Sequence, residues 1–257
     1  MARWWLFFAG YTDFLCLLLI QTCSFKDTSP CAPSSCGSIP DIREPFRLET
    51  DPKDCGDQKY CLSCQNNQTV LYLYSGKYYE QAINYNNFTI RLMDAGVQKN
   101  SCFSLPHFPL STGNFTGSGE PDVYFYYNRS RKLWLSDFMI FISCPTPVNS
   151  TLYVDAAACD DWVYSSAIDS SVDHLQRHSY VSGTRGTLGE KDESCRLEMI
   201  TFLPKGEYRN TSLEQIQKSL AYGFELSWFN FYCPKNCSDG CFLDTANHMK
   251  CFSNSGE

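Results

Sequence analysis

The sequence predicts a disulfide-rich fold dominated by β-strands. Fifteen cysteines among 257 residues far exceed ordinary usage and are typical of a chain that folds in an oxidising compartment. Aromatic residues reach 15% while charged residues are only 19%, a balance that favours strands over helices. An apolar content of 43% is enough for a packed core. We therefore expect two small cysteine-stapled β modules, with one short helix in the second.

The N-terminus predicts a secretory signal peptide over residues 1–24. Arg3 precedes the apolar run Phe14–Ile20, and the small residues Thr22 to Ser24 suit cleavage. Asp13 interrupts this pattern, so an uncleaved membrane anchor is the alternative. Beyond residue 25 the longest apolar run is Phe138–Ile142, so we expect no membrane span in this chain. The net charge of −7 gives no indication of nucleic-acid binding, which needs a basic face.

Seven Asn-x-Ser/Thr triplets predict a glycosylated surface, and they support the same secretory route. None of the seven has proline in the middle position, which would block the modification. Their asparagines are Asn67, Asn87, Asn114, Asn128, Asn149, Asn210 and Asn236.

Residues 25–103 predict the first cysteine-rich β module. Five prolines between residues 25 and 54 exclude a long helix there. Gly37 closes a tight loop, because glycine accepts a positive φ without steric cost. The segment Ile39–Phe46 is typical of an edge strand. Three further strands are expected at Val70–Tyr74, Tyr78–Ile83 and Phe88–Met93, joined by polar turns.

Residues 104–143 predict a connecting loop followed by strands. Pro, Gly, Ser and Thr dominate residues 104–122, and strands are expected at Val123–Tyr127 and Phe138–Ser143. Pro145 then ends the second of these strands.

Residues 144–257 predict the second cysteine-rich module. Strands are expected at Leu152–Val154, Arg196–Leu203 and Phe224–Phe229, and the polar stretch 169–194 is expected to be one long loop. The single helix runs to Tyr222, with Ser212 as its N-cap in a capping box and Gly223 at its exit.

The ordered motifs of the chain resemble a plant receptor family. The segments Cys31-x4-Cys36-Gly37, IPDIREPF (39–46), Cys55-Gly56 with Cys64, INYNNFTIRLMDAG (83–96) and Cys102 resemble the galacturonan-binding module of wall-associated receptor kinases. FISCPTPVNSTLYVDAAAC (141–159), SCRLEMI (194–200), YGFELSWF (222–229) and Cys241 to Asp244 resemble the C-terminal cysteine-rich module found with it. The combination is similar to the ectodomains of leaf-rust-resistance receptor-like kinases.

The resemblance implies a secreted or wall-facing, non-catalytic ectodomain whose first module binds pectin. In relatives a membrane span and a kinase follow. This chain has no glycine-rich loop or other kinase motif, so any kinase lies outside it, and a soluble receptor-like protein and part of a longer receptor both remain open. Two positions depart from the family: Glu44 stands where tyrosine is usual, and Cys61 is extra.

An odd number of cysteines follows the signal peptide, because Cys16 and Cys23 lie inside it. We expect Cys61 to be the free thiol or an intermolecular bridge. The expected disulfide cysteines are Cys31, Cys36, Cys55, Cys64, Cys102, Cys144, Cys159, Cys195, Cys233, Cys237, Cys241 and Cys251.

Binding of a polyanion needs cations for its carboxylates and aromatic faces for its sugar rings. Residues 25–103 carry eight basic against nine acidic side chains, whereas residues 104–257 carry twelve against eighteen, so the first module is the less repulsive half. For each residue the alternative is a solvated cation or a tyrosine packed in the core. Calcium bridging of carboxylates is a further route, and no resident cofactor is expected. The candidates are Arg43, Arg47, Lys53, Lys59, Lys77, Arg91, Tyr72 and Tyr74, with Tyr78, Tyr79 and Tyr85 as further platforms.

The remaining chemistry-bearing residues have structural explanations that we prefer. We interpret Cys61 and Cys64 as structural half-cystines and not as a redox pair. His174 and His178 lie in a polar stretch that lacks the glutamate of a zinc motif. The acidic pair at 160–161 would serve glycoside cleavage only inside a suitable cleft. We therefore expect no catalytic or metal site. The alternative functions are a protein-interaction ectodomain, binding a peptide or a co-receptor without sugar, and more remotely a secreted hydrolase.

Overall fold

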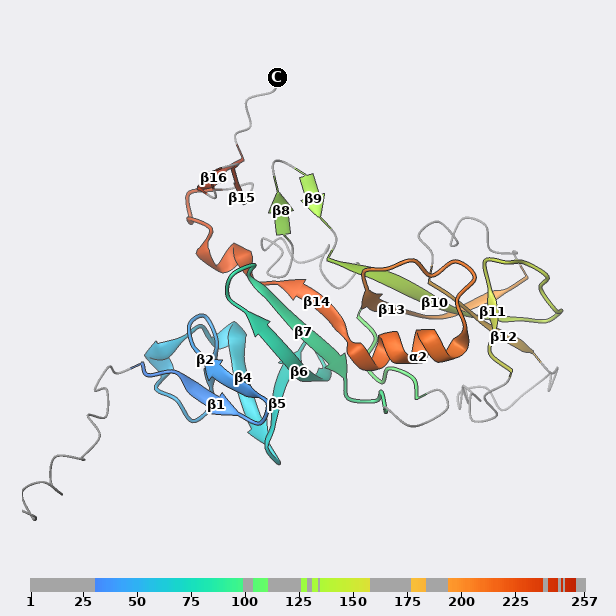
Figure 1. The fold of residues 1–257 in the computed structure, drawn as a ribbon, viewed down its shortest axis with the longest axis horizontal. Helices are drawn as coiled ribbons and strands as arrows, with labels where there is room; N and C mark the ends of the chain where they lie inside the picture. Colours follow the sequence, from blue (N-terminus) through green and yellow to red (C-terminus); the bar gives the residue numbers. More distant parts are fainter. Residues whose placement is uncertain are drawn as a thin grey trace, which may run out of the picture.

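The computed structural model describes residues 31–98, 104–110, 126–128, 131–133, 135–157, 177–183, 194–237, 240–244, 246 and 248–252. Strands dominate these residues, one α-helix accompanies them, and five disulfides cross-link them (Figure 1). The predicted disulfide-rich, mostly β fold is confirmed.

The largest sheet has six strands in the order β14-β7-β6-β5-β4-β3. Neighbours are antiparallel except β3 and β4, which run parallel. The edge strand β14 follows β7 in the chain by 130 positions, counted from Asp94 to Phe224, yet pairs with it directly (Figure 1). The strands are β3 (Arg47–Leu48), β4 (Cys61–Gln65), β5 (Gln68–Leu73), β6 (Gly76–Asn84), β7 (Thr89–Asp94) and β14 (Phe224–Ser227).

One face of this sheet builds the first core together with the hairpin of β1 (Ser34–Cys36) and β2 (Ile39–Ile42). The disulfide Cys36–Cys64 ties the hairpin to β4. Gly37 turns the hairpin with φ of 58°, as the sequence predicts. The core draws on both halves of the chain, since it contains Leu71, Tyr78, Ile90 and Leu92 as well as Phe202, Phe224, Leu226 and Trp228.

The second sheet has the order β11-β12-β10-β13 and packs against the helix α2. Met93 of β7 joins this second core beside Ile216 and Leu220 of α2, so the helix also covers one end of the six-stranded sheet. Cys144–Cys195 joins β10 to the start of β13. The elements are β10 (Ser136–Cys144), β11 (Val154–Asp155), β12 (His178–Ser182), β13 (Arg196–Pro204) and α2 (Leu213–Tyr222).

A third, small sheet of order β16-β15-β8-β9 lies near the C-terminal end of the described residues. The disulfides Cys233–Cys241 and Cys237–Cys251 hold its strands to the preceding turn. Its strands are β8 (Tyr126–Asn128), β9 (Arg131–Leu133), β15 (Cys241–Leu243) and β16 (Met249–Cys251). Short 3₁₀ helices complete the fold: η1 (Lys53–Cys55), η2 (Gln58–Tyr60) and η4 (Phe229–Tyr232).

The prediction of one long loop over 169–194 is wrong where the structure describes it. His178–Ser182 form β12, which pairs with β10 along its whole length. Tyr180 and Val181 are buried, but two apolar residues among polar neighbours are too weak a local signal for a strand. Hydrogen bonding to β10 therefore decides this element. In the described part of the chain, no helix combines the length and the apolar character needed to span a membrane.

Candidate ligand-binding site

Several predicted ligand-binding residues lie on the face of the six-stranded sheet that points away from the first core. Successive side chains of a strand alternate between the two faces, so Tyr72, Lys77, Tyr79 and Arg91 point away while their neighbours Leu71, Tyr78 and Ile90 fill the core. We call this surface the outer face, made of Gln65, Tyr72, Lys77, Tyr79 and Arg91.

The side chains of β4, β5 and β6 are linked across the outer face. The Gln65 Nε2 amide donates to the Tyr72 hydroxyl at 2.9 Å, and the Lys77 ammonium donates to Gln65 Oε1 at 2.9 Å. The same ammonium lies 5.5 Å from the centre of the Tyr79 ring. These contacts hold Tyr72 in place while 53% of it stays exposed.

Arg91 extends the outer face towards the helix α2. Its guanidinium carbon lies 4.1 Å above the ring of Tyr222, the last residue of α2, which is 51% exposed. The backbone N–H of Ala95 donates to the Lys77 carbonyl, so Ala95 lies opposite Lys77. Arg91 lies on β7, four residues before Ala95. At ~3.3 Å per residue, roughly 13 Å separate the backbones of the two cationic residues along the strand.

The outer face thus offers exposed aromatic rings, a hydrogen-bonded amide and two spaced cations. Glu225 lies opposite Arg91 in the ladder and adds one negative charge. Tyrosine and arginine faces suit the apolar faces of sugar rings, and lysine and arginine suit carboxylates. An elongated, weakly acidic chain molecule is the kind of ligand that fits this chemistry.

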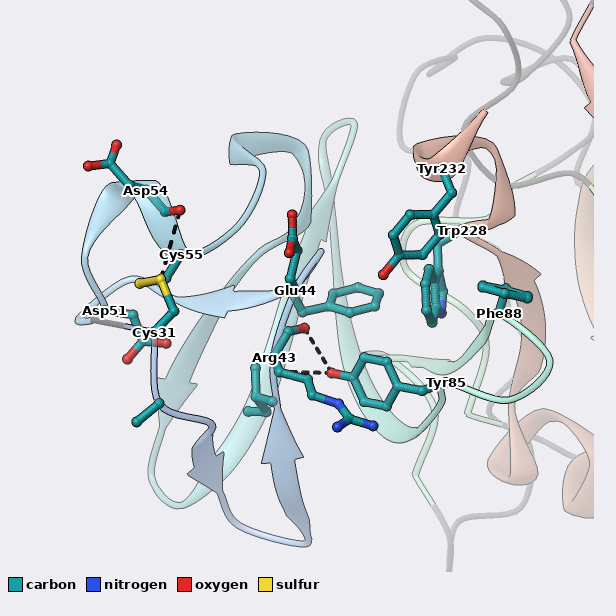
Figure 2. A pocket seen from close by; sticks show the side chains of 13 residues that line it. Cys31, Arg43, Glu44, Asp51, Asp54, Cys55, Tyr85, Phe88, Trp228 and Tyr232 are labelled. Atoms are coloured by element: carbon teal, nitrogen blue, oxygen red, sulfur yellow. Dashed lines mark hydrogen bonds between the residues drawn. A yellow bond between two sulfur atoms is a disulfide. The ribbon is translucent and has the colours of Figure 1, made fainter. Parts of the chain in front are cut away.

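A separate pocket of about 400 Å³ lies between the first β units and the segment after β14 (Figure 2). We call it the junction pocket. Its lining comprises Cys31, Ala32, Ile42, Arg43, Glu44, Phe46, Asp51, Asp54, Cys55, Tyr85, Phe88, Trp228 and Tyr232.

Tyr85 is the best-anchored wall of the junction pocket. Its hydroxyl accepts from the Arg43 backbone N–H and donates to the Arg43 carbonyl, both at 2.9 Å (Figure 2). The Arg43 guanidinium lies 4.6 Å above the Tyr85 ring. Burial is the main cause that raises the pKa of Tyr85 to about 12, so its hydroxyl stays protonated at neutral pH.

Trp228 supports this wall from behind. It is 1% exposed and makes edge-to-face contacts with Phe46, Tyr85 and Phe88, at 5.2 to 5.6 Å between ring centres. No sequence signal points to this role, because Trp228 lies more than 130 positions from these three residues and reaches them through the pairing of β14 with β7.

Residues 31–94 match the family model described as wall-associated receptor kinase galacturonan-binding. These residues form a wall-associated receptor kinase galacturonan-binding module. The resemblance of the first module is thereby confirmed over residues 31–94, and a module of this kind points to an extracellular, generally non-catalytic receptor part. Comparison of the chain with curated proteins and with solved structures returned no match.

The matched segment ends with β7, but the sheet and both candidate sites extend beyond it. Tyr222, which packs against Arg91 of the outer face, and Trp228 and Tyr232 of the junction pocket come from the segment beyond it. The resemblance of that second segment to a C-terminal cysteine-rich module stays a prediction, as do the domain boundaries.

The other predicted residues of the galacturonan-binding module are dispersed. Arg47 is 5% exposed and donates to the Leu48 carbonyl and to Gln58 Oε1, so it lies inside the fold and not on the surface where the sequence places it. Lys53 and Lys59 are exposed on η1 and η2, and Tyr74 is 58% exposed in the turn after β5.

Two of the predicted tyrosine platforms differ in exposure. Tyr78 is 1% exposed in the first core and donates to the Phe108 carbonyl, so it is a core residue. Tyr79 lies on the outer face and is only partly buried.

The described cysteines fall into five disulfides and one thiol. Cys64 bonds to Cys36, so it forms no redox pair with Cys61. Cys61 is the cysteine left free among the described residues, and burial raises the pKa of its thiol. Cys31 pairs with Cys55. Cys102, Cys159, His174 and the acidic pair at 160–161 lie outside the described residues.

Five of the predicted glycosylation sites can be placed, and all five asparagines are exposed. They are Asn67, Asn87, Asn149, Asn210 and Asn236. Asn114 and the side chain of Asn128 lie outside the described part of the chain.

Proposed function

We propose that this chain is a non-catalytic, secreted ligand-binding ectodomain facing the plant cell wall, and that its outer face binds acidic pectin chains. The match of residues 31–94 to a galacturonan-binding family carries the proposal. The spacing of Lys77 and Arg91 supports it, because two cations along an extended strand suit a ligand whose carboxylates repeat along a chain.

Direct binding of oligogalacturonides to the purified glycosylated chain tests this function. We expect binding that weakens as salt rises, since charge pairs at an exposed surface are screened. A neutral glucan of the same length serves as the control ligand and binds weakly or not at all. Salt-insensitive binding, or equal binding of the neutral glucan, contradicts the proposal.

Single substitutions test whether the ligand binds to the outer face. Lys77→Gln and Arg91→Gln each lower the affinity for oligogalacturonide, roughly two- to fivefold for a partly exposed ion pair. Lys205→Gln is the matched control, because Lys205 is exposed in the loop before α2 and belongs to neither site. A loss of the same size in the control variant would show that overall charge, not this surface, governs binding.

Repeating the binding measurement with and without calcium distinguishes direct binding by cationic side chains from calcium bridging between carboxylates. Chelation leaves binding through Lys77 and Arg91 unchanged, whereas bridging between protein and ligand carboxylates needs the ion. Loss of binding only on calcium removal would move the site to acidic residues and contradict the outer-face assignment.

A further inference from the structure

The junction pocket has the opposite charge balance from the outer face. Glu44, Asp51 and Asp54 line it against the single cation Arg43. Arg43 itself is partly neutralised, since its Nε lies 3.5 Å from a carboxylate oxygen of Asp41. The pocket therefore carries a net negative charge and disfavours a uronate carboxylate.

The acidic groups of the pocket do not converge on one point. Among the described residues, no three carboxylate, histidine or cysteine side chains lie close enough together to hold a metal ion. The carboxylate of Asp51 accepts from the Ser34 hydroxyl at 2.6 Å and from the Leu48 N–H at 2.7 Å, so it is already satisfied. Glu44 and Asp54 are both exposed, but the Asp54 carboxylate points away from the aromatic wall, so Glu44 is the carboxylate placed to meet an organic cation (Figure 2).

Aromatic rings complete a site for such a cation. Tyr85 and Tyr232 form one wall of the pocket, and Tyr232 belongs to the segment after β14 (Figure 2). Tyr232 is 41% exposed. The position of Arg43 above Tyr85 is an example of cation binding to these rings from within the chain. Glu44 and Tyr232 both line the pocket, and the Tyr232 ring points towards the side on which Glu44 lies (Figure 2).

We infer that the junction pocket binds the basic side chain, lysine or arginine, of a peptide or protein partner. Glu44 would meet the charge, Asp54 would add to the negative field around the pocket, and Tyr232 would pack against the aliphatic stem and the cation. The galacturonan-binding module and the segment after β14 both contribute walls, so the site exists only in the assembled fold. This inference does not depend on pectin binding by the outer face.

Titration of the full glycosylated chain with trilysine amide at low salt tests the inference. The matched control ligand is the same peptide with its three side chains acetylated, which keeps its length and removes the side-chain charges. We expect measurable binding of the first and none of the second. Equal binding of the acetylated peptide would overturn the inference.

Arg43→Gln gives the sharpest test, because the expected sign depends on the ligand. Removing this cation strengthens binding of trilysine amide, whereas it would weaken binding of a uronate in the same pocket. The substitution keeps the anchor of Tyr85, since both of its hydrogen bonds go to backbone atoms of Arg43. An unchanged or weakened affinity for trilysine amide would overturn the inference.

Glu44→Gln is the complementary variant, and we expect it to weaken trilysine binding roughly two- to fivefold. Glu49→Gln is its matched control, because Glu49 is exposed nearby but does not line the pocket. Equal losses in both variants would mean that the peptide binds the acidic surface at large. Lys77→Gln, which tests the outer face, leaves trilysine affinity unchanged or slightly raised, so failure of one proposal is distinguishable from failure of the other.

Discussion

Among single residues, Glu80 carries the clearest pH-dependent contribution to stability. It is 2% exposed on β6, and neither carboxylate oxygen has a hydrogen-bonding partner among the described residues. Burial without compensation disfavours the charged form, and it raises the pKa of Glu80 from 4.5 to about 8. The neutral acid is therefore the form that the core accepts.

Glu80→Gln should remove a pH dependence of the folded state. The folded pKa lies above the unfolded one, so stability is fully present below pH 4.5 and falls as pH rises to about 8. The fall is at most ~1.4 kcal/mol per pH unit. Urea unfolding between these pH values should show a flatter profile for Glu80→Gln than for the parent chain.

The exposed Glu49→Gln serves as the control for this measurement and should keep the parent profile. If Glu80→Gln also keeps it, Glu80 is not the group that titrates on unfolding.

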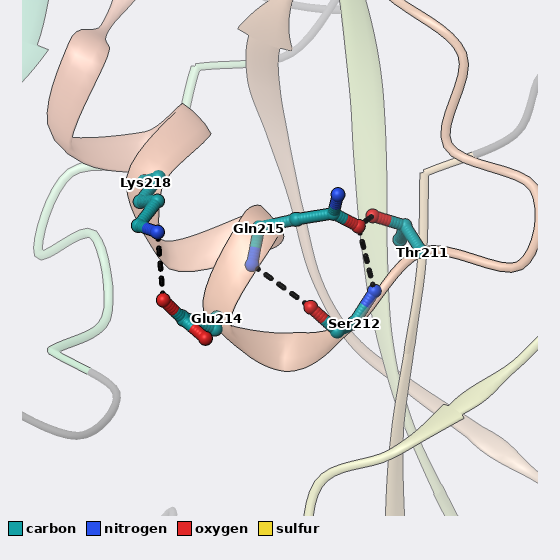
Figure 3. A network of polar contacts seen from close by, with 5 residues as sticks. All are labelled: Thr211, Ser212, Glu214, Gln215 and Lys218. Atoms are coloured by element: carbon teal, nitrogen blue, oxygen red, sulfur yellow. Dashed lines mark hydrogen bonds and ion pairs between the residues drawn. The ribbon is translucent and has the colours of Figure 1, made fainter.

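Among the elements, the helix α2 shows the closest agreement between a sequence motif and its geometry. Ser212 accepts from the Gln215 backbone N–H at 3.3 Å, and Gln215 accepts in return from the Ser212 N–H at 3.2 Å (Figure 3). The capping box thus satisfies two amides that the first turn leaves without helical partners. Ile216 and Leu220 then face the second core.

Ser212→Ala should lower the free energy of unfolding by about 1 kcal/mol, the usual cost of a lost N-cap. The change is measured as the shift of the urea midpoint. Lys218→Ala is the control on the same helix, since it removes only the exposed ion pair with Glu214 and should shift the midpoint less (Figure 3). A midpoint for Ser212→Ala equal to that of the parent would contradict the assigned role of the cap.

Another element, β14, connects the two halves of the chain. It completes the six-stranded sheet on β7, and Trp228, which follows it, donates its backbone N–H to the Phe88 carbonyl. Without β14, β7 becomes an open edge with unpaired backbone groups. The galacturonan-binding module therefore depends on a strand that lies far outside its own sequence.

For the whole molecule, this dependence predicts that residues 31–98 do not fold stably alone. The fragment lacks Phe224, Leu226 and Trp228, three buried members of the first core. A chain of this length buries little apolar surface, so losing three core side chains removes a large part of its stability. We expect a non-cooperative urea transition and weak near-ultraviolet circular dichroism, with the full chain as the control. A sharp transition and a native-like spectrum of the fragment would refute the shared core.

The sequence by itself determined the features that depend on local patterns. Four strands of the first module (β2, β5, β6 and β7), the Gly37 turn, the capped helix and the disulfide-rich fold class follow from alternation, cap residues and cysteine content, whereas β1, β3 and β4 were not predicted. The sequence also directed attention to Tyr72, Lys77, Arg91 and Arg43, each of which lies at one of the two candidate sites.

Only the tertiary structure decided which distant segments meet. The pairing of β14 with β7, the burial of Arg47 and the positions of Tyr222, Trp228 and Tyr232 at the two sites leave no local trace. A strand pattern specifies which face of the strand is buried but not which partner supplies its hydrogen bonds. Long-range packing makes that choice, and in this chain it joins the galacturonan-binding module to the segment that completes it.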